Sequence, residues 1–209
     1  MECPLCSHSE DQQFCANGKC YHRCAVCGLV YMDENNRLDA FDEKKRYSFH
    51  QNNIDDAGYV GFLGRVIEPA MEYISVGMKG LDYGCGPNPV LAQIVRSKGL
   101  ECDFYDPFFF PLLDTEKKYD FVFATECFEH FFSPRHELDM ICSILKHGGT
   151  LNVMTELMTD STDFDGWYYK NDPTHVCFYS GKSIAYICGK YGFTELYNDK
   201  HRVIILRKS

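Results

Sequence analysis

The chain has 209 residues, of which 45% are apolar, and its 21 basic and 30 acidic side chains give a formal charge of −9. Such a chain can bury one sizeable core beside a small accessory module, and its acidic balance disfavours a nucleic-acid partner and favours a small-molecule one. Because no signal-like segment opens the sequence and no apolar stretch approaches the ~18 residues that span a bilayer, we expect a cytoplasmic protein with no membrane partner.

Residues 1–31 carry two Cys-x-x-Cys pairs, formed by Cys3 with Cys6 and by Cys24 with Cys27. Seventeen residues separate the two pairs, a spacing that is typical of a four-cysteine zinc site. Four thiolates complete the tetrahedral shell of Zn²⁺ and leave no position for a reactant, so the predicted zinc is structural. The sequence therefore predicts a small N-terminal zinc module.

The remaining cysteines of this module, Cys15 and Cys20, lack that spacing and are interpreted as spare thiols or alternative zinc ligands. The twelve cysteines of the chain favour metal ligation and buried thiols over a disulfide framework, given the expected compartment. A segment of 31 residues cannot bury enough apolar surface to fold alone, and zinc binding, at ~10 to 16 kcal/mol, is the expected source of its order.

Residues 32–57 are polar and are interpreted either as a surface linker or as a lid over an active site. The lid hypothesis depends on a run of side chains rich in hydrogen-bonding groups, namely Tyr47, Phe49, His50, Gln51, Asn52 and Asn53. The sequence alone leaves both alternatives open.

Residues 58–209 alternate between apolar patterns of helical and of strand period. The expected helices cover 59–74 with a kink at Pro69, 89–98, 133–147 and 182–191, and the expected strands cover 80–83, 101–105, 119–125, 150–155, 193–197 and 201–206. The last two strands are predicted to close the domain as an antiparallel pair. We therefore predict an α/β fold with a doubly wound, mostly parallel sheet and one antiparallel edge strand.

The strand at 80–83 runs into the motif Asp82-Tyr83-Gly84-Cys85-Gly86, and Asp106 ends the next strand twenty positions past Gly86. Two glycines allow a tight turn and a close approach of the backbone to a ligand, while a carboxylate at the tip of the second strand can accept both hydroxyls of a ribose. Residues 87–89 are Pro-Asn-Pro, without the third glycine of a pyrophosphate-binding loop. The motif predicts a nucleoside ligand rather than a dinucleotide.

Several motifs in this order resemble the class I S-adenosylmethionine-dependent methyltransferases, in a branch of small bacterial enzymes that often carry an N-terminal zinc ribbon. The resemblance covers about residues 58–207 and includes the acidic Gly-x-Gly turn, Asp106, the strand 119–123 leading to Glu126, Glu129 and His130, and the turn 146–149. The segment 167–180, which reads WYYKNDPTHVCFYS, also resembles a recurring signature of that branch. The resemblance implies a Rossmann-like methyltransferase domain with S-adenosylmethionine as cofactor and zinc in the N-terminal module.

The resemblance also implies the residues that bind the cofactor, with the glycine turn at its methionine end and Asp106 at its ribose. They are Asp82, Tyr83, Gly84, Cys85, Gly86, Asp106, Thr125 and Glu126. Only twelve residues separate Asp106 from Tyr119, where the family usually fits a helix, a third strand and an adenine-contacting residue. The adenine pocket is therefore not mapped, and Phe108–Phe110 either cover the ring or belong to the core.

Methyl transfer from a sulfonium requires the protein to align the acceptor, exclude water and remove a proton if the acceptor carries one. By the resemblance, Glu129 and His130 face the methyl group, while Tyr169 and His175 belong to a loop that covers the acceptor. Each of the four also has a purely structural interpretation, in which Glu129 anchors a loop, His130 is a satisfied core histidine, His175 stabilises a turn and Tyr169 packs.

Three hypotheses for the function follow. The first is methyl transfer to oxygen, nitrogen or carbon of an unidentified small molecule. The second is RNA methylation, since a zinc ribbon before this fold also resembles some ribosomal RNA methyltransferases, although the acidic charge disfavours it. The third is a catalytically inactive, zinc-organised interaction protein, for which the short segment between Asp106 and Tyr119 is the best support.

Overall fold

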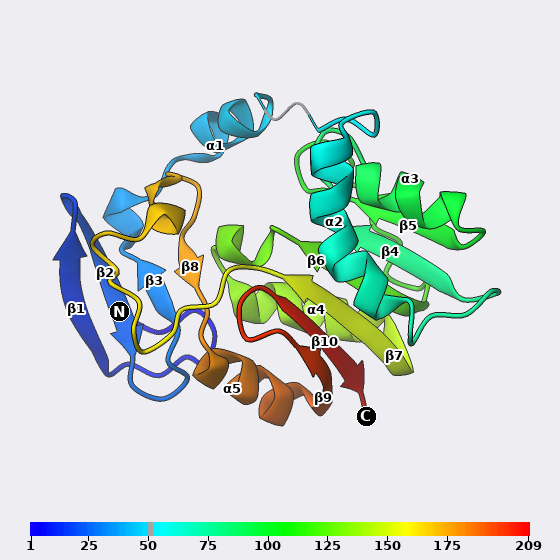
Figure 1. The fold of residues 1–209 in the computed structure, drawn as a ribbon. Helices are drawn as coiled ribbons and strands as arrows, with labels where there is room; N and C mark the ends of the chain where they lie inside the picture. Colours follow the sequence, from blue (N-terminus) through cyan, green and yellow to red (C-terminus); the bar gives the residue numbers. More distant parts are fainter. Residues whose placement is uncertain (50–51) are drawn as a thin grey trace.

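The computed structural model describes residues 1–49 and 52–209, so His50 and Gln51 of the expected linker lie outside the described residues. Figure 1 shows a six-stranded sheet at one end of the molecule, a four-stranded sheet at the other, and α1 above the region between them. The helices are α1 (Ala40–Tyr47), α2 (Ala57–Ala70), α3 (Val90–Ser97), α4 (Pro134–Ile144) and α5 (Gly181–Tyr191), with short 3-10 helices at Glu34–Asn36, Phe128–His130 and Tyr168–Asn171. The strands are β1 (Asp11–Ala16), β2 (Lys19–Cys24), β3 (Val30–Met32), β4 (Lys79–Tyr83), β5 (Glu101–Tyr105), β6 (Tyr119–Thr125), β7 (Leu145–Met154), β8 (Cys177–Phe178), β9 (Phe193–Asn198) and β10 (Val203–Lys208).

The large sheet has the strand order β5-β4-β6-β7-β10-β9 and is mostly parallel, as predicted. Strands β5, β4, β6 and β7 run parallel, whereas β10 is antiparallel to both β7 and β9. The reversed strand therefore lies one place in from the edge, because the closing hairpin inserts its second strand between β7 and β9. No helix or strand occurs between β5 and β6, and β5 forms the other edge of the sheet.

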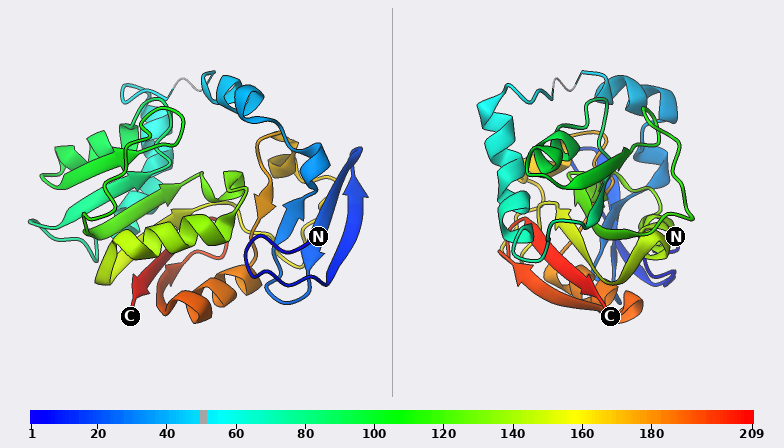
Figure 2. Two further views of the ribbon diagram at one scale, coloured as in Figure 1. Left: turned by 180° about the vertical axis from the view of Figure 1, so that it is seen from behind. Right: turned by 90° about the vertical axis from the view of Figure 1, so that its right-hand side faces the viewer.

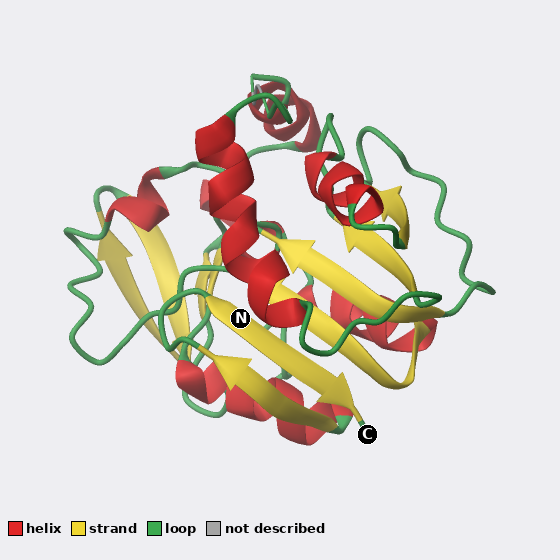
Figure 3. Ribbon diagram, turned by 45° about the vertical axis from the view of Figure 1, so that its right-hand side comes forward, coloured by secondary structure: helices red, strands yellow, loops and turns green. Residues whose placement is uncertain are grey.

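Helices cover both faces of this sheet, which makes it doubly wound (Figure 3). On one face, α2 and α3 pack against alternate strand residues such as Phe121 and Phe123. On the other face, α4 and α5 pack against the intervening residues, such as Val122 and Ala124. This alternation follows from the two-residue period of a strand whose two faces are both buried.

Three elements differ most from the sequence-based expectation in their bounds. Helix α2 ends at Ala70 rather than at residue 74, so Pro69 occupies its last turn. Helix α4 ends at Ile144, and β7 begins directly at Leu145. Leu145 pairs with Tyr119 and the ladder resumes at Thr150, so the expected turn at 146–149 is a bulge within β7 rather than a connection before it.

The small sheet joins the N-terminal module to a late segment of the chain. Its order is β1-β2-β3-β8, and β8 brings Cys177 and Phe178 against Tyr31 and Val30 of β3. Leu29 and Phe178 are completely buried in one apolar core that continues under the large sheet. Figure 2 shows the small sheet and the large sheet from two further sides. Residues 1–31 therefore bury apolar surface against the later chain, so zinc is not the single source of order that was expected.

Among residues 1–49 and 52–209, no helix combines the length and the apolarity that a bilayer span requires.

Candidate active site

A cavity of about 420 Å³ opens where the parallel strands β4 and β6 end. This is the edge at which doubly wound folds bind their ligands, and the volume is within the ~300 to 1,000 Å³ of small-molecule pockets. All of the predicted cofactor-binding residues line it, namely Asp82, Tyr83, Gly84, Cys85, Gly86, Asp106, Thr125 and Glu126. Of the predicted catalytic residues, Glu129, His130 and His175 line it and Tyr169 does not.

The two glycines of the bend are required for different structural reasons. Both have positive φ, 79° at Gly84 and 67° at Gly86. A Cβ on Gly84 would lie 2.7 Å from the Cβ of Cys127, whereas a Cβ on Gly86 would meet no atom within 4 Å. Gly84 is therefore required for close packing, and Gly86 for a left-handed backbone beside the cavity. The amides of Gly84 and Cys85 donate to the carbonyl of Tyr105, which ties the bend to β5.

Asp106 lies at the tip of β5, as the spacing predicts, and it binds the backbone. Its Oδ2 accepts from the Gly86 amide at 2.9 Å, and its Oδ1 accepts from the amides of Phe108 and Phe109 at 2.9 and 3.1 Å. A carboxylate has about four acceptor sites, so about one remains for a ligand. The structure thus adds a role for Asp106, the locking of the glycine bend, that the sequence did not suggest.

Asp82 is the most deeply buried carboxylate of the bend. It is 3% exposed and accepts one hydrogen bond, from the amide of Ala92 in α3 at 3.2 Å. Burial, with the nearby charge of Asp106, raises its pKa from 3.8 to about 7. The carboxyl group is therefore close to half protonated at neutral pH, and a cationic ligand beside it would favour the ionised form.

Helix α1 supplies a wall of the cavity, where Tyr47 of the candidate lid lies and where sequence reasoning missed Glu43. Glu43 is 6% exposed, lines the cavity and accepts a hydrogen bond from Tyr47 at 2.9 Å. Burial and the charge of Asp106 raise the pKa of Glu43. The ring of Tyr47 packs against His130 and Phe108, with centroids 5.2 and 5.7 Å apart. The signal in the sequence was the spacing of Glu43 and Tyr47, which are four residues apart and so lie on one face of a helix.

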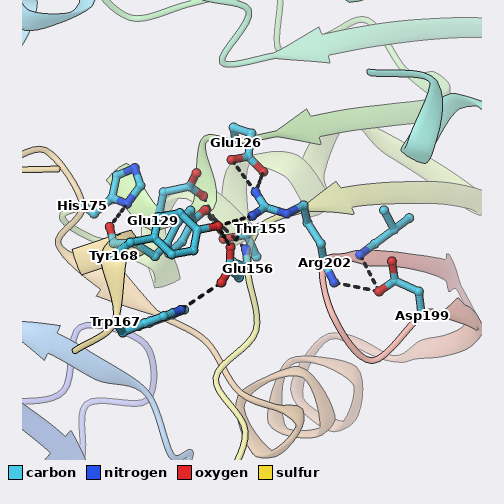
Figure 4. Close-up of polar contacts among 11 residues, drawn as sticks. Glu126, Glu129, Thr155, Glu156, Trp167, Tyr168, His175, Asp199 and Arg202 are labelled. Atoms are coloured by element: carbon cyan, nitrogen blue, oxygen red, sulfur yellow. Dashed lines mark hydrogen bonds and ion pairs between the residues drawn. The ribbon is translucent and has the colours of Figure 1, made fainter. Parts of the chain in front are cut away.

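Arg202 of the loop before β10 binds the carboxylates of Glu126, which lines the cavity, and of Glu156 (Figure 4). Its Nη1 donates to both carboxylate oxygens of Glu126 at 2.9 Å, and its Nη2 donates to Glu156 and to the hydroxyl of Tyr168. Trp167 also donates to Glu156, at 2.8 Å. Glu126 has a positive φ of 48°, and burial with the charge of Glu129 raises its pKa to about 8 although Arg202 opposes this. None of these partners of Glu126 was visible in the sequence.

The fold brings together three of the predicted catalytic residues, Glu129, His130 and His175, although His175 is far from the other two in sequence. One potential ligand atom of each lies within 4.8 Å of those of the other two. Burial lowers the pKa of His130 to about 4, so this ring is neutral at pH 7. Tyr169 packs its ring 4.3 Å from that of His175, and its hydroxyl lies 3.4 Å from Thr155 Oγ1 and accepts from the Glu156 amide. The structure therefore gives Tyr169 a position behind His175, outside the cavity lining.

The four cysteines of the N-terminal module form a cluster that fits zinc. Their sulfurs lie within 4.8 Å of one another, with Cys3 and Cys27 at 3.5 Å and Cys6 and Cys24 at 3.4 Å. A tetrahedral zinc with Zn–S of about 2.3 Å needs sulfurs about 3.8 Å apart, which this arrangement allows.

Cys15 and Cys20 form a disulfide with each other, so their interpretation as spare thiols or alternative zinc ligands was wrong. The two residues face each other across the β1–β2 hairpin, with Cα atoms 4.1 Å apart. The hairpin was not predicted, and without it nothing in the sequence brings these residues together.

Comparison with known proteins agrees with this geometry. Residues 56–197 match the profile of a family described as a methyltransferase domain. No curated protein sequence matches the chain.

Solved methyltransferase structures share the fold. An O-methyltransferase family protein from Burkholderia thailandensis superposes with a TM-score of 0.55 at 16% identity, over 84% of this chain and 65% of that one. A chain from the complex of the Haloferax volcanii Trm112 methyltransferase activator with a putative methyltransferase gives 0.53 at 14% identity, over 80% and 97%. The mitomycin 7-O-methyltransferase MmcR gives 0.52 at 12% identity, over 81% and 67%. The chain thus spans less than two thirds of the length of the Burkholderia protein.

Proposed function

The chain belongs to the methyltransferase domain family, whose enzymes draw their methyl group from S-adenosylmethionine, and we propose that its acceptor is a small molecule. The observation that carries the proposal is the lining of one cavity by both the predicted cofactor residues and three of the four predicted catalytic residues. Cofactor and acceptor would therefore meet in one enclosed space, as a direct displacement requires.

The residues of the bend would hold the cofactor. Gly84 and Gly86 leave room for its amino-acid end, the Asp82 carboxylate complements its positive charge, and Asp106 or Glu43 offers a carboxylate oxygen to the ribose. When bound, S-adenosylmethionine supplies an electrophilic methyl group. Glu43 and Tyr47 would then exclude water from the reacting atoms, so we propose that α1, in residues 32–57, acts as a lid.

On the acceptor side, Glu129, His130 and His175 are the polar groups nearest to one another. The two rings are held in place by the carbonyls of Thr174 and Tyr169. We propose that these three side chains orient the acceptor and provide for removal of its proton.

A small acceptor suits the charge of −9 and the volume of the cavity better than a polynucleotide does. RNA remains the second candidate, because an N-terminal zinc ribbon before this fold also resembles some ribosomal RNA methyltransferases. The intact cavity disfavours a purely structural role. We also propose a cytoplasmic location, since ten of the twelve cysteines form no disulfide.

Isothermal titration calorimetry with S-adenosylmethionine tests the proposal on the full chain. We expect one site per chain and a loss of affinity of at least about tenfold in Glu43→Gln or Asp106→Asn, the equivalent of one charge-assisted hydrogen bond. The matched control is Asp114→Asn, an exposed carboxylate in the segment after β5. Absence of binding to the wild-type protein would refute the proposed function. Tight RNA binding that weakens steeply with salt would instead favour the second candidate.

A further inference from the structure

The end of the cavity formed by the 3-10 helix Phe128–His130 and the loop before β8 holds three side chains of metal-ligating type. Glu129 and His130 come from the 3-10 helix, and His175 comes from the loop. One oxygen or nitrogen of each lies within 4.8 Å of those of the others, and all three residues line the cavity. The set contains two imidazoles and one carboxylate, which is a donor set for divalent transition metals.

The carboxylate is the first reason to infer a cation. Glu129 is completely buried, its Oε2 accepts a hydrogen bond from Thr155 Oγ1 at 2.8 Å, and the hydroxyl of Tyr169 also interacts with its carboxylate. Within the described part of the chain, its Oε1 is buried with no hydrogen-bond partner. The nearby guanidinium of Arg202 binds Glu126 and Glu156 instead. A buried carboxylate oxygen without a partner is costly unless a ligand completes its environment.

The two histidines are the second reason, because each is oriented by its Nδ1. Nδ1 of His130 lies 3.0 Å from the carbonyl of Thr174, and Nδ1 of His175 lies 2.6 Å from the carbonyl of Tyr169. A carbonyl oxygen can only accept, so both Nδ1 atoms carry the proton and the lone pair of each ring is on Nε2. Metal-binding histidines are held in this way, with one ring nitrogen on a backbone carbonyl and the other on the metal.

We propose that Glu129, His130 and His175 bind one divalent transition-metal ion, and that this ion binds an oxygen of the acceptor. The proposal rests on the proposed function for the identity of the acceptor, but the metal site itself does not. Three protein ligands leave positions open, in contrast to the closed shell of four cysteines at the zinc cluster. The site therefore favours an acceptor with a hydroxyl group beside a second oxygen donor, which can occupy two open positions.

The ion would assist the reaction as a Lewis acid, without any change of oxidation state. It would lower the pKa of a bound hydroxyl, whose proton would leave to bulk water before α1 covers the cavity. The oxygen then forms a bond to the methyl carbon, and the carbon–sulfur bond breaks with its electron pair remaining on sulfur. The sulfonium charge and the alkoxide charge cancel, so atoms and charge balance.

Mn²⁺ is a suitable probe, because it prefers oxygen and nitrogen ligands and competes poorly for the four thiolates. The protein is purified with its zinc, and free Mn²⁺ is measured by electron paramagnetic resonance during a titration. We expect one Mn²⁺ per chain and a higher melting temperature in its presence. In His175→Ala and Glu129→Gln we expect the Mn²⁺ affinity to fall by more than about tenfold, since each removes one ligand. The matched control is His147→Ala, an exposed histidine in the bulge of β7.

Failure of Mn²⁺ to bind the wild-type protein would overturn the proposal, whatever the variants do. Equal Mn²⁺ binding by wild type, His175→Ala and Glu129→Gln would overturn it as well. Calorimetry with S-adenosylmethionine on the same preparation separates this result from the proposed function. Cofactor binding without Mn²⁺ binding would refute only the metal site, and Mn²⁺ binding without cofactor binding would refute only the methyltransferase activity.

Discussion

The N-terminal cysteine cluster and the cluster of Glu129, His130 and His175 have opposite designs. The first brings together four identical ligands from two tight turns, with all sulfurs within 4.8 Å and no position left for a reactant. The second brings together three mixed ligands at the wall of a cavity of about 420 Å³. We propose that the first cluster serves the stability of the fold and the second serves chemistry, so substitutions should separate stability from activity.

The largest effect should come from breaking the cysteine cluster. Cys24→Ser removes one of the four proposed zinc ligands, and structural zinc contributes ~10 to 16 kcal/mol in small domains. Because β3 of this module shares a core with β8, we expect the melting temperature of the whole chain to fall by more than about 10 °C. Differential scanning calorimetry measures this. Cys142→Ser, at a half-buried thiol of α4 outside the cluster, is the control, and an equal effect of both changes would contradict the prediction.

The cavity should instead carry a stability cost that depends on pH. The pKa of Asp82 rises from 3.8 in the unfolded chain to about 7 in the folded protein, so between these values the folded state holds a proton that the unfolded state has lost. Stability should therefore fall as pH rises from about 4 to about 7, by up to roughly 4 kcal/mol from this group. Urea unfolding at pH 5 and pH 8 tests this, and Asp82→Asn should lose that part of the pH dependence. The prediction would be wrong if the unfolding free energy of Asp82→Asn differed between pH 5 and pH 8 as much as that of the wild-type protein.

The glycine bend offers a smaller contrast within the cavity itself. Gly86→Ala should cost ~1 to 2 kcal/mol from its left-handed backbone, since its Cβ would meet no atom within 4 Å. Gly84→Ala should cost more, because its Cβ would also lie 2.7 Å from Cys127. Chemical denaturation of both variants measures which one loses more unfolding free energy. Equal losses would mean that the packing against Cys127 relaxes freely.

The smallest effect on stability should come from the ion pair that ties α1 to the loop before β8. Arg46 and Asp172 lie 2.9 Å apart, and the arginine side chain is 44% exposed. Arg46→Ala should therefore change the unfolding free energy by less than about 1 kcal/mol. If α1 is a lid, the same change should speed the dissociation of S-adenosylmethionine, which stopped-flow fluorescence can follow. Lys45→Ala, on the same helix, is the control, and equal dissociation rates in both variants would count against the lid.

Much of the fold could be predicted from short-range patterns. The strands 101–105 and 119–125 were predicted with the bounds that the structure has. The Cys-x-x-Cys spacing likewise singled out the four clustered cysteines. These signals are local, because a period of two, a turn or a pair of ligands is complete within a few residues.

Apart from the bounds of α2, α4 and β7, the misses concern contacts between distant segments or an unpredicted hairpin. The disulfide between Cys15 and Cys20 depends on the register of β1 with β2. Glu43 reaches the cavity because α1 folds back over it, and Arg202 meets Glu126 across 76 positions of sequence. No pattern along the chain reports such a distance, since it depends on how complete elements pack.

The sequence by itself determined the α/β class, the glycine bend with Asp106 after it, and the four cysteines, because in each case the residues act through neighbours a few positions away or through one strand-helix repeat. Only the tertiary structure decided that β8 completes the N-terminal sheet and that His175 joins Glu129 and His130 at the cavity. The physical reason is that burial and proximity depend on how segments that are far apart in sequence pack together into one core.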